Sequence, residues 1–219
     1  MNISSEQLRL YAITDRKWCI DDTLEDQISA ALSGGVTILQ LREKNMNDED
    51  FLSAAIAVKK ITSRFNVPLI INDNVDVAIK CDADGIHVGQ NDADVNEIRK
   101  CWGNDKIIGV SARTVEAAVY AEKCGADYLG VGAMFATSTK TDTAHVSFET
   151  LKKICSAVKI PVVAIGGITE SNMTQLEKSK AAGIAVVSAI FAAGNLDEIK
   201  VASCKLRKKS EDLFANYKR

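Results

Sequence analysis

The sequence predicts a (β/α)8 barrel, the TIM barrel, formed by a single α/β domain that spans residues 1–219. Short runs rich in Val, Ile and Leu alternate with longer amphipathic stretches along the whole chain, which is typical of a parallel sheet with helical crossovers. Eight such apolar runs can be counted. A length of 219 residues allows one substantial core but is short for two independent domains.

The expected strands and helices alternate from one end to the other. The strands cover 8–13, 36–41, 68–71, 85–88, 106–109, 128–130, 161–165 and 185–187. The helices cover 23–33, 48–64, 74–80, 93–101, 114–123, 147–157, 171–179 and 195–214. The helix at 48–64 illustrates the pattern, because acidic residues begin it, basic residues end it and apolar residues recur on one face.

A weak internal repeat supports the closed barrel. The phrases "SGGVTILQL" at 33, "CDADGIHVG" at 81, "CGADYLGVG" at 124 and "KAAGIAVVS" at 180 each place small or turn-forming residues before an apolar strand. Their spacing of roughly two β-α units is what successive quarters of an eight-fold barrel would produce. The alternative, a doubly wound open sheet, would need a glycine-rich dinucleotide loop after the first strand, and "AITDRKW" has none.

Composition excludes several classes of partner. With 27 basic and 29 acidic residues the chain has no basic field for nucleic acid or a membrane surface. Its six cysteines form no C-x-x-C pair and have no adjacent His, which argues against zinc and a redox dithiol. The amino terminus lacks a signal-peptide pattern, and no stretch approaches the ~18 apolar residues of a spanning helix. We expect a reduced, cytoplasmic protein.

Polar residues that follow the apolar runs are the candidates for function, because the active site of such a barrel lies at the carboxyl ends of its strands. In "QLREK", Gln40, Arg42 and Lys44 alternate along an extended segment, so their side chains tend to the same side. Two cations and an amide aimed at one point suggest an anion with several oxygens. The alternative is a solvated cluster paired with Glu43 or with acids of the next helix.

The next two strand ends carry carboxylates. Asn72 and Asp73 follow one strand, and Asp92 follows the next. Beside cations that prefer phosphate, two carboxylates make a Mg²⁺ site in which phosphate and water supply the other ligands. Asp73 could instead cap the following helix. For His87, inside an apolar strand, a packed, hydrogen-bonded interior position is favoured over a catalytic role.

The remaining strand ends offer hydroxyls and glycines. Ser111 has no nucleophile elbow around it, so we expect a hydrogen-bond donor rather than a hydrolase triad. The long connection 131–147 carries Thr137, Thr139 and Lys140 and resembles a lid over a phosphorylated ligand, with a surface loop as the alternative.

The last two strand ends form the typical phosphate site of such barrels. Gly166 and Gly167 would let the backbone approach an anion, and a short extra helix would begin at Ser188. Together with the strand ends on the opposite side, they predict two anion sites on one face. That arrangement suggests a transferase that joins two phosphorylated small molecules and releases diphosphate.

The order and spacing of "QLREK", "IINDN", "GIHVGQND", "GVSA", "TSTK", "AIGGI" and "VVSAI" closely resemble the thiamine-phosphate synthase family over about residues 8–192. The resemblance implies a barrel enzyme that joins 4-amino-2-methyl-5-(diphosphooxymethyl)pyrimidine to 4-methyl-5-(2-hydroxyethyl)thiazole phosphate, or to its 2-carboxy form. The products would be thiamine phosphate and diphosphate.

The resemblance also assigns residues. It implies that the pyrimidine diphosphate contacts Gln40, Leu41, Arg42, Glu43, Lys44, Asn72, Ser111 and Lys140, of which Arg42, Lys44, Ser111 and Lys140 are catalytic. It implies one Mg²⁺ per subunit on Asp73 and Asp92. It assigns the thiazole phosphate to Thr137, Ser138, Thr139, Gly167, Val187 and Ser188.

The implied mechanism needs no general base. Cations stabilise the departing diphosphate, a pyrimidine cation forms early, and the thiazole nitrogen attacks it. Two positions depart from the family pattern, since Arg113 replaces a common His and the loop before Thr137 lacks prolines. The alternatives are a thiazole tautomerase on the same barrel, which relies on a His in this region, and a non-catalytic phosphate-binding barrel. A homo-oligomer is compatible with all three.

Overall fold

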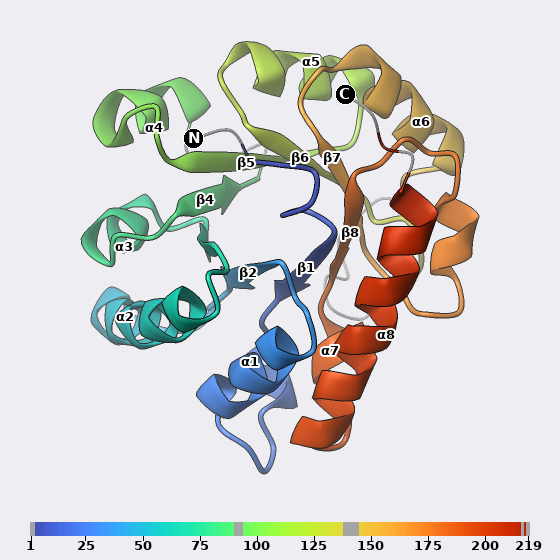
Figure 1. The fold of residues 1–219 in the computed structure, drawn as a ribbon. Helices are drawn as coiled ribbons and strands as arrows, with labels where there is room; N and C mark the ends of the chain where they lie inside the picture. The colour runs from blue at the N-terminus through green and yellow to red at the C-terminus, as the bar shows by residue number, and fades with distance from the viewer. Residues whose placement is uncertain (1–2, 90–93, 138–144, 216, 218–219) are drawn as a thin grey trace.

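The computed structural model describes residues 3–89, 94–137, 145–215 and 217. It confirms the predicted fold, because eight parallel strands close into a barrel in sequence order, with β8 pairing back onto β1 (Figure 1). The helices form an outer ring around these strands, and α8 closes the ring by packing against α1. Among the described residues, no helix has both the length and the apolar character needed to cross a membrane.

The strands are short and the helices lie between them. The strands are β1 (Leu10–Ile13), β2 (Ile38–Leu41), β3 (Leu69–Asn72), β4 (Gly85–Val88), β5 (Ile107–Ala112), β6 (Tyr128–Val131), β7 (Val162–Ile165) and β8 (Gly183–Val186). The α-helices are α1 (Leu24–Ser33), α2 (Asp48–Arg64), α3 (Val75–Lys80), α4 (Val95–Trp102), α5 (Val115–Lys123), α6 (Phe148–Ala157), α7 (Ser188–Phe191) and α8 (Leu196–Phe214). Two 3₁₀ helices, η1 (Arg16–Trp18) and η2 (Met173–Leu176), complete the set.

Two predicted elements differ from the structure by more than two residues at an end. The helix expected at 171–179 is only the single turn η2, because Lys178 and Lys180 both adopt left-handed backbone angles with φ of 65°. A non-glycine residue in that region cannot continue a right-handed helix. Strand β5 also extends beyond 109 as far as Ala112, so Ser111 lies inside the strand rather than after it.

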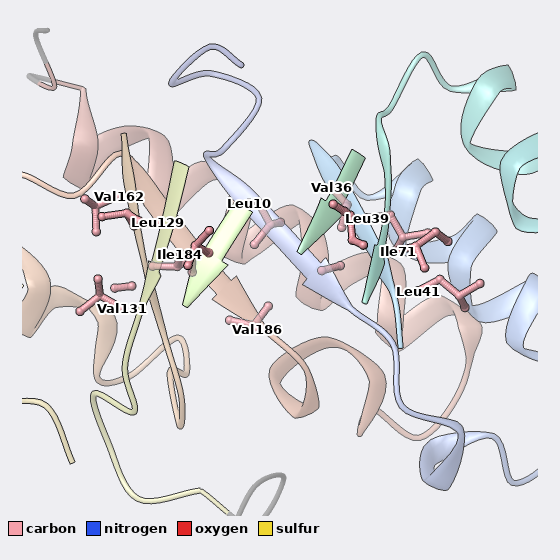
Figure 2. Close-up of a cluster of buried hydrophobic side chains, with 14 of the residues drawn as sticks. Leu10, Val36, Leu39, Leu41, Ile71, Leu129, Val131, Val162, Ile184 and Val186 are labelled. Atoms are coloured by element: carbon pink, nitrogen blue, oxygen red, sulfur yellow. The ribbon is translucent and has the colours of Figure 1, made fainter. Parts of the chain in front are cut away.

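Each strand is buried on both faces, and alternate residues serve two separate layers. Outward residues such as Leu39, Leu41 and Ile71 pack against the helices in the larger apolar cluster, part of which Figure 2 shows. Inward residues, including Ile38, Ile70 and Tyr128, form a second cluster inside the barrel. This continuous burial explains the uninterrupted apolar runs in the sequence, which are typical of parallel sheets.

The interior is filled by pairing large side chains with glycines. Tyr11 on β1 and Tyr128 on β6 are almost fully buried, and their rings meet edge to face with centroids 5.9 Å apart. A Cβ atom on Gly109 of β5 would lie 2.0 Å from Cζ of Tyr128, so only glycine leaves room for that ring. The ring of Tyr128, which pairs with Gly109 from the neighbouring strand β6, therefore fills the space that a side chain at 109 would occupy.

The internal repeat corresponds to a repeated bond at the amino-terminal rim. The residue that precedes each even-numbered strand donates its backbone N–H to a carbonyl of the strand before. These residues are Thr37 before β2 (2.9 Å), Asp84 before β4 (3.0 Å), Asp127 before β6 (2.7 Å) and Ala182 before β8 (2.8 Å). In the first three, the side chain also accepts an N–H from that strand, at 2.9, 2.8 and 2.7 Å. Each even-numbered strand is thus fastened to the strand before it.

Gly109→Ala tests the interior packing. The added methyl group would clash with the buried Tyr128 ring, so the free energy of unfolding in urea should fall by about 1–3 kcal/mol or more. Gly194→Ala is the matched control, because its Cβ would meet only the movable end of Glu198, at 3.0 Å. Equal losses in the two variants would contradict this account of the interior.

Candidate active site

A cavity of about 350 Å³ opens at the carboxyl ends of the strands. Its wall is built from residues at the ends of all eight strands or just after them, namely Tyr11, Ile13, Gln40, Arg42, Lys44, Asn72, Asp73, His87, Gly89, Ser111, Arg113, Gly130, Gly132, Ala133, Thr137, Val163, Ile165, Gly166, Gly167, Ile168, Ala185, Val186, Val187 and Ser188. Residues separated by up to 177 positions, from Tyr11 to Ser188, therefore share one space.

The segment after β2 contributes the cations that its alternation predicts. Gln40, Arg42 and Lys44 all line the cavity. The backbone N–H of Arg42 donates to Thr14 Oγ1 at 3.0 Å, and its guanidinium lies 3.7 Å from Asp15. Its Nε is buried and has no hydrogen-bond partner within the described part of the chain. The Arg42 side chain thus retains donor capacity for an anion.

Two members of the same segment point elsewhere. The Leu41 side chain lies in the apolar layer between strands and helices. The Glu43 carboxylate accepts a hydrogen bond from Arg16 Nε at 2.7 Å, and burial raises the pKa of this carboxyl above its ordinary value. Neither Leu41 nor Glu43 is among the residues that line the cavity.

Asp73 is held at the cavity mouth by three neighbours. Lys44 Nζ donates to one carboxylate oxygen at 2.8 Å and Asn72 Nδ2 donates to the other at 2.6 Å. The Asp73 backbone N–H donates to the His87 carbonyl at 2.9 Å, and its φ of 64° is left-handed. Asn74, and not Asp73, caps α3 by accepting from the Val77 N–H. The alternative role of Asp73 as a helix cap is therefore wrong.

The surroundings of Asp73 fit a magnesium ion. Its carboxylate is about one third exposed at the mouth, and the Lys44 partner is 44% exposed. Such an open ion pair contributes little to stability and can exchange partners. Within the described ranges no group of three or more His, Cys, Asp or Glu could hold a metal. A hard cation with few protein ligands would use a carboxylate such as Asp73 and take its other ligands from phosphate and water.

Five side chains form a hydrogen-bonded series across the barrel interior. Gln40 Nε2 donates to the Tyr11 hydroxyl at 2.8 Å, and that hydroxyl lies 2.8 Å from the Tyr128 hydroxyl. His87 Nδ1 lies 2.9 Å from the Tyr128 hydroxyl, and His87 Nε2 lies 3.0 Å from Ser111 Oγ. Burial raises the pKa of both tyrosines well above the ordinary value. The structure confirms the interior, hydrogen-bonded position expected for His87.

The opposite wall offers glycines and hydroxyls. Gly166 and Gly167 have φ of 98° and 63°, and a Cβ on either would collide with backbone atoms of the connection after β6. Val187 and Ser188 line the cavity, and α7 begins at Ser188, where the sequence predicts a short helix. Thr137 and Arg113 also face this space. First-turn N–H groups and close backbone are the usual donors to phosphate in this position.

Four predicted site residues lie outside the described residues. They are Asp92, Ser138, Thr139 and Lys140. The sequence analysis in turn missed Tyr11 and Tyr128. Both stand in strands that are buried on both faces, where alternation does not separate the inside of the barrel from its outside.

Comparison with known proteins identifies one family. The family model described as thiamine monophosphate synthase matches residues 10–190. The chain is 55% identical to thiamine-phosphate synthase of Ruminiclostridium cellulolyticum over 182 residues, which cover 83% of this chain and 87% of the relative. The enzyme of the same name from Clostridium tetani is 50% identical over the same shares of the two chains.

A solved structure agrees with the sequence relatives. Thiamine phosphate pyrophosphorylase from Pyrococcus furiosus superposes with a TM-score of 0.87 at 36% identity, covering 95% of this chain and 98% of the other. The likeness thus extends over nearly the whole chain. The chain belongs to the thiamine-phosphate synthase family.

Proposed function

We propose that this transferase joins 4-amino-2-methyl-5-(diphosphooxymethyl)pyrimidine to 4-methyl-5-(2-hydroxyethyl)thiazole phosphate, or to its 2-carboxy form, with Mg²⁺ bound at Asp73 and Asp92. One observation carries the proposal. One cavity has cations and a carboxylate on the wall formed after β2 and β3, and glycines and Ser188 on the wall formed after β7 and β8. Two phosphorylated substrates can therefore meet with their reacting ends together.

The first wall suits a diphosphate leaving group. Arg42 offers a planar fork of N–H donors, and Lys44 offers a mobile ammonium that already reaches Asp73 at 2.8 Å. Lys140, from the connection after β6, would add a third cation. Negative charge develops on the diphosphate as its bond to carbon breaks. Cations held at that place lower the energy barrier without any proton transfer.

Magnesium would supply further positive charge to the diphosphate oxygens when bound. Asp73 and Asp92 are the protein ligands that we assign to it. Lys44 would leave Asp73 for the diphosphate as the ion and substrate bind, because the open Lys44–Asp73 pair holds both groups only weakly. Asn72 then keeps the Asp73 carboxylate oriented through its 2.6 Å hydrogen bond.

The second wall suits the thiazole phosphate. Gly167, Val187 and Ser188 surround the space at the start of α7, and Thr137 faces it from the connection after β6. Ser138 and Thr139 would complete the contacts. This placement brings the thiazole nitrogen toward the pyrimidine methylene carbon, so that proximity does much of the catalytic work.

No protein nucleophile or general base is required by this scheme. The carbon–oxygen bond to diphosphate breaks, the electron pair leaves with the diphosphate, and the thiazole nitrogen lone pair forms the new carbon–nitrogen bond. With the 2-carboxy substrate, the carboxylate also leaves as CO₂, and the electron pair that it leaves on the thiazole C2 takes up a proton from solvent. We also propose a cytoplasmic location, which the six free thiols support.

Diphosphate release is the direct test of the proposed function. Release should require the pyrimidine diphosphate, the thiazole phosphate and Mg²⁺ together, and chelation of the metal should abolish it. Binding of both phosphates without turnover would instead indicate a non-catalytic barrel, and isomerisation of a thiazole carboxylate phosphate would indicate a tautomerase.

Asp92→Ala tests the metal assignment. Removing one of two carboxylate ligands should reduce kcat/KM by at least about 100-fold, with little change in the midpoint of urea unfolding. Asp94→Ala is the matched control, because Asp94 caps α4 with its side chain on the Asn96 N–H. The control should lose about 1 kcal/mol of stability and retain turnover. Unchanged turnover in Asp92→Ala would contradict the assignment.

Lys44→Ala tests the role of the leaving-group cation. We expect a loss of about 100-fold or more in kcat, because the positive charge acts on the departing diphosphate. Lys59→Ala is its control, since Lys59 forms a similar pair with Asp84, at 2.7 Å, on the far rim of the barrel. Steady-state kinetics that show comparable losses of kcat in the two variants would overturn this role for Lys44.

A further inference from the structure

The hydrogen-bonded series through the barrel ends at the cavity on both sides. Gln40, Tyr11, His87 and Ser111 all line the cavity, and Tyr128 joins Tyr11 to His87 through the interior. Each residue comes from a different strand, in the order β2, β1, β6, β4 and β5. The series therefore depends on closure of the whole barrel.

The barrel interior is shaped to admit this series. A Cβ on Gly109 would overlap the Tyr128 ring, and a Cβ on Gly130 would lie 3.1 Å from Cε1 and 3.5 Å from Nε2 of His87. Two inward positions on neighbouring strands are therefore glycine where the polar rings pass. Two tyrosine hydroxyls inside an otherwise apolar cluster also require hydrogen-bond partners to offset their desolvation.

The number of protons in the series sets its direction. The Gln40 amide nitrogen can only donate, so the Tyr11 oxygen accepts from it. The Tyr11 O–H is then satisfied by donating to the Tyr128 oxygen, and the Tyr128 O–H by donating to His87 Nδ1. That nitrogen must carry no proton, so the neutral ring is protonated at Nε2, which faces Ser111 Oγ.

The opposite direction leaves a buried donor unsatisfied. If His87 Nδ1 carried a proton, the Tyr128 oxygen would accept it and the Tyr128 O–H would point at Tyr11. The Tyr11 oxygen would then accept from both Gln40 and Tyr128, and its own O–H would find no acceptor in these two partners. A buried, unpaired hydroxyl costs about 1–3 kcal/mol. If both nitrogens of His87 carried protons, Nδ1 would again donate to Tyr128, and the Tyr11 O–H would again lack an acceptor.

We propose that His87 is a positioning residue, fixed as the Nε2–H tautomer by the Gln40–Tyr11–Tyr128 series, and that it turns the Ser111 hydroxyl into a donor aimed at the anionic ligand. Because the Ser111 oxygen accepts from His87, its proton is directed into the cavity. The expected recipient is an oxygen of the diphosphate group, and this last step rests on the proposed function.

The tautomer can be measured directly in the free protein. The chain contains two histidines, so His145→Gln leaves His87 as the sole source of signals from isotope-labelled histidine. Nitrogen NMR should show Nε2 protonated and Nδ1 unprotonated. The buried tyrosines keep their protons at alkaline pH, because burial raises both pKa values, so the pattern should persist there. A protonated Nδ1 would overturn the proposal.

Gln40→Glu should reverse the series. Once carbon NMR shows that the introduced carboxyl is ionised, it can only accept, so Tyr11 donates to it, Tyr128 donates to Tyr11 and His87 donates from Nδ1. The tautomer should therefore switch. Adding Tyr11→Phe interrupts the series, and His87 should return to the Nε2–H form. Failure to switch in Gln40→Glu, or a switch that persists in the double variant, would refute control through the tyrosines.

Binding of inorganic diphosphate with Mg²⁺ tests the consequence for Ser111. Ser111→Ala and His87→Leu should each weaken binding by about tenfold in calorimetry, the value of one lost hydrogen bond. The double variant should lose no more than either single variant, because His87 acts through Ser111. His87→Gln retains an amide donor and should stay within about threefold of the parent chain. Additive losses, or no rescue by Gln, would contradict the positioning role.

These measurements separate the two proposals. The tautomer and diphosphate affinity need no turnover, so both can appear as expected in a protein that releases no diphosphate from the substrate pair. If the protein releases diphosphate but His87 is protonated at Nδ1, the proposed function holds and only the positioning role of His87 is refuted.

Discussion

Hydrogen bonding between β1 and β8 is the constraint on which the structure depends. Tyr11 pairs with Ala185 and Ala12 with Val186, which joins the two ends of the sheet into a closed ring. Because all eight strands are parallel, closure gathers their carboxyl ends on one rim. The cavity exists only at that rim, and its two walls, after β2–β3 and after β7–β8, face each other because the ring is closed.

Closure also gives the interior a limited volume, which the chain fills unevenly. Two buried tyrosines occupy the middle of the barrel, and glycines stand where their rings and the His87 ring need space. The interior side chains therefore have two roles: they fill the barrel, and they form a hydrogen-bonded series across it. A substitution inside the barrel changes stability and, through Tyr128 and His87, the hydrogen-bonding state of a side chain in the active site.

The alternation of apolar runs with amphipathic stretches predicted the eight strands, because parallel strands buried on both faces appear as continuous Val, Ile and Leu runs. The internal repeat and the missing dinucleotide loop favoured a closed barrel over an open sheet. The same property hid Tyr11 and Tyr128, since a doubly buried strand does not reveal which residues face inward. The prediction of a helix at 171–179 was wrong, because Lys178 and Lys180 adopt left-handed backbone angles. Gly or Asn at these positions would have indicated such angles, but lysine does not. Polar residues at strand ends were recognised, and the structure gathers Gln40, Arg42 and Asp73 in one cavity. The hydrogen-bond partners of these residues, such as Lys44 for Asp73, could be identified only from the structure, because they are distant in the sequence.

The repeated bonds at the amino-terminal rim have a consequence for how the barrel is assembled. Thr37, Asp84 and Asp127 fasten strands in pairs, β1 with β2, β3 with β4 and β5 with β6, while Ala182 keeps only the backbone bond for the last pair. The barrel is thus a ring of four modules, each carrying its own fastening at the rim away from the catalytic face. The last pair, β7 with β8, lacks the side-chain hydrogen bond that the other three pairs have at this rim.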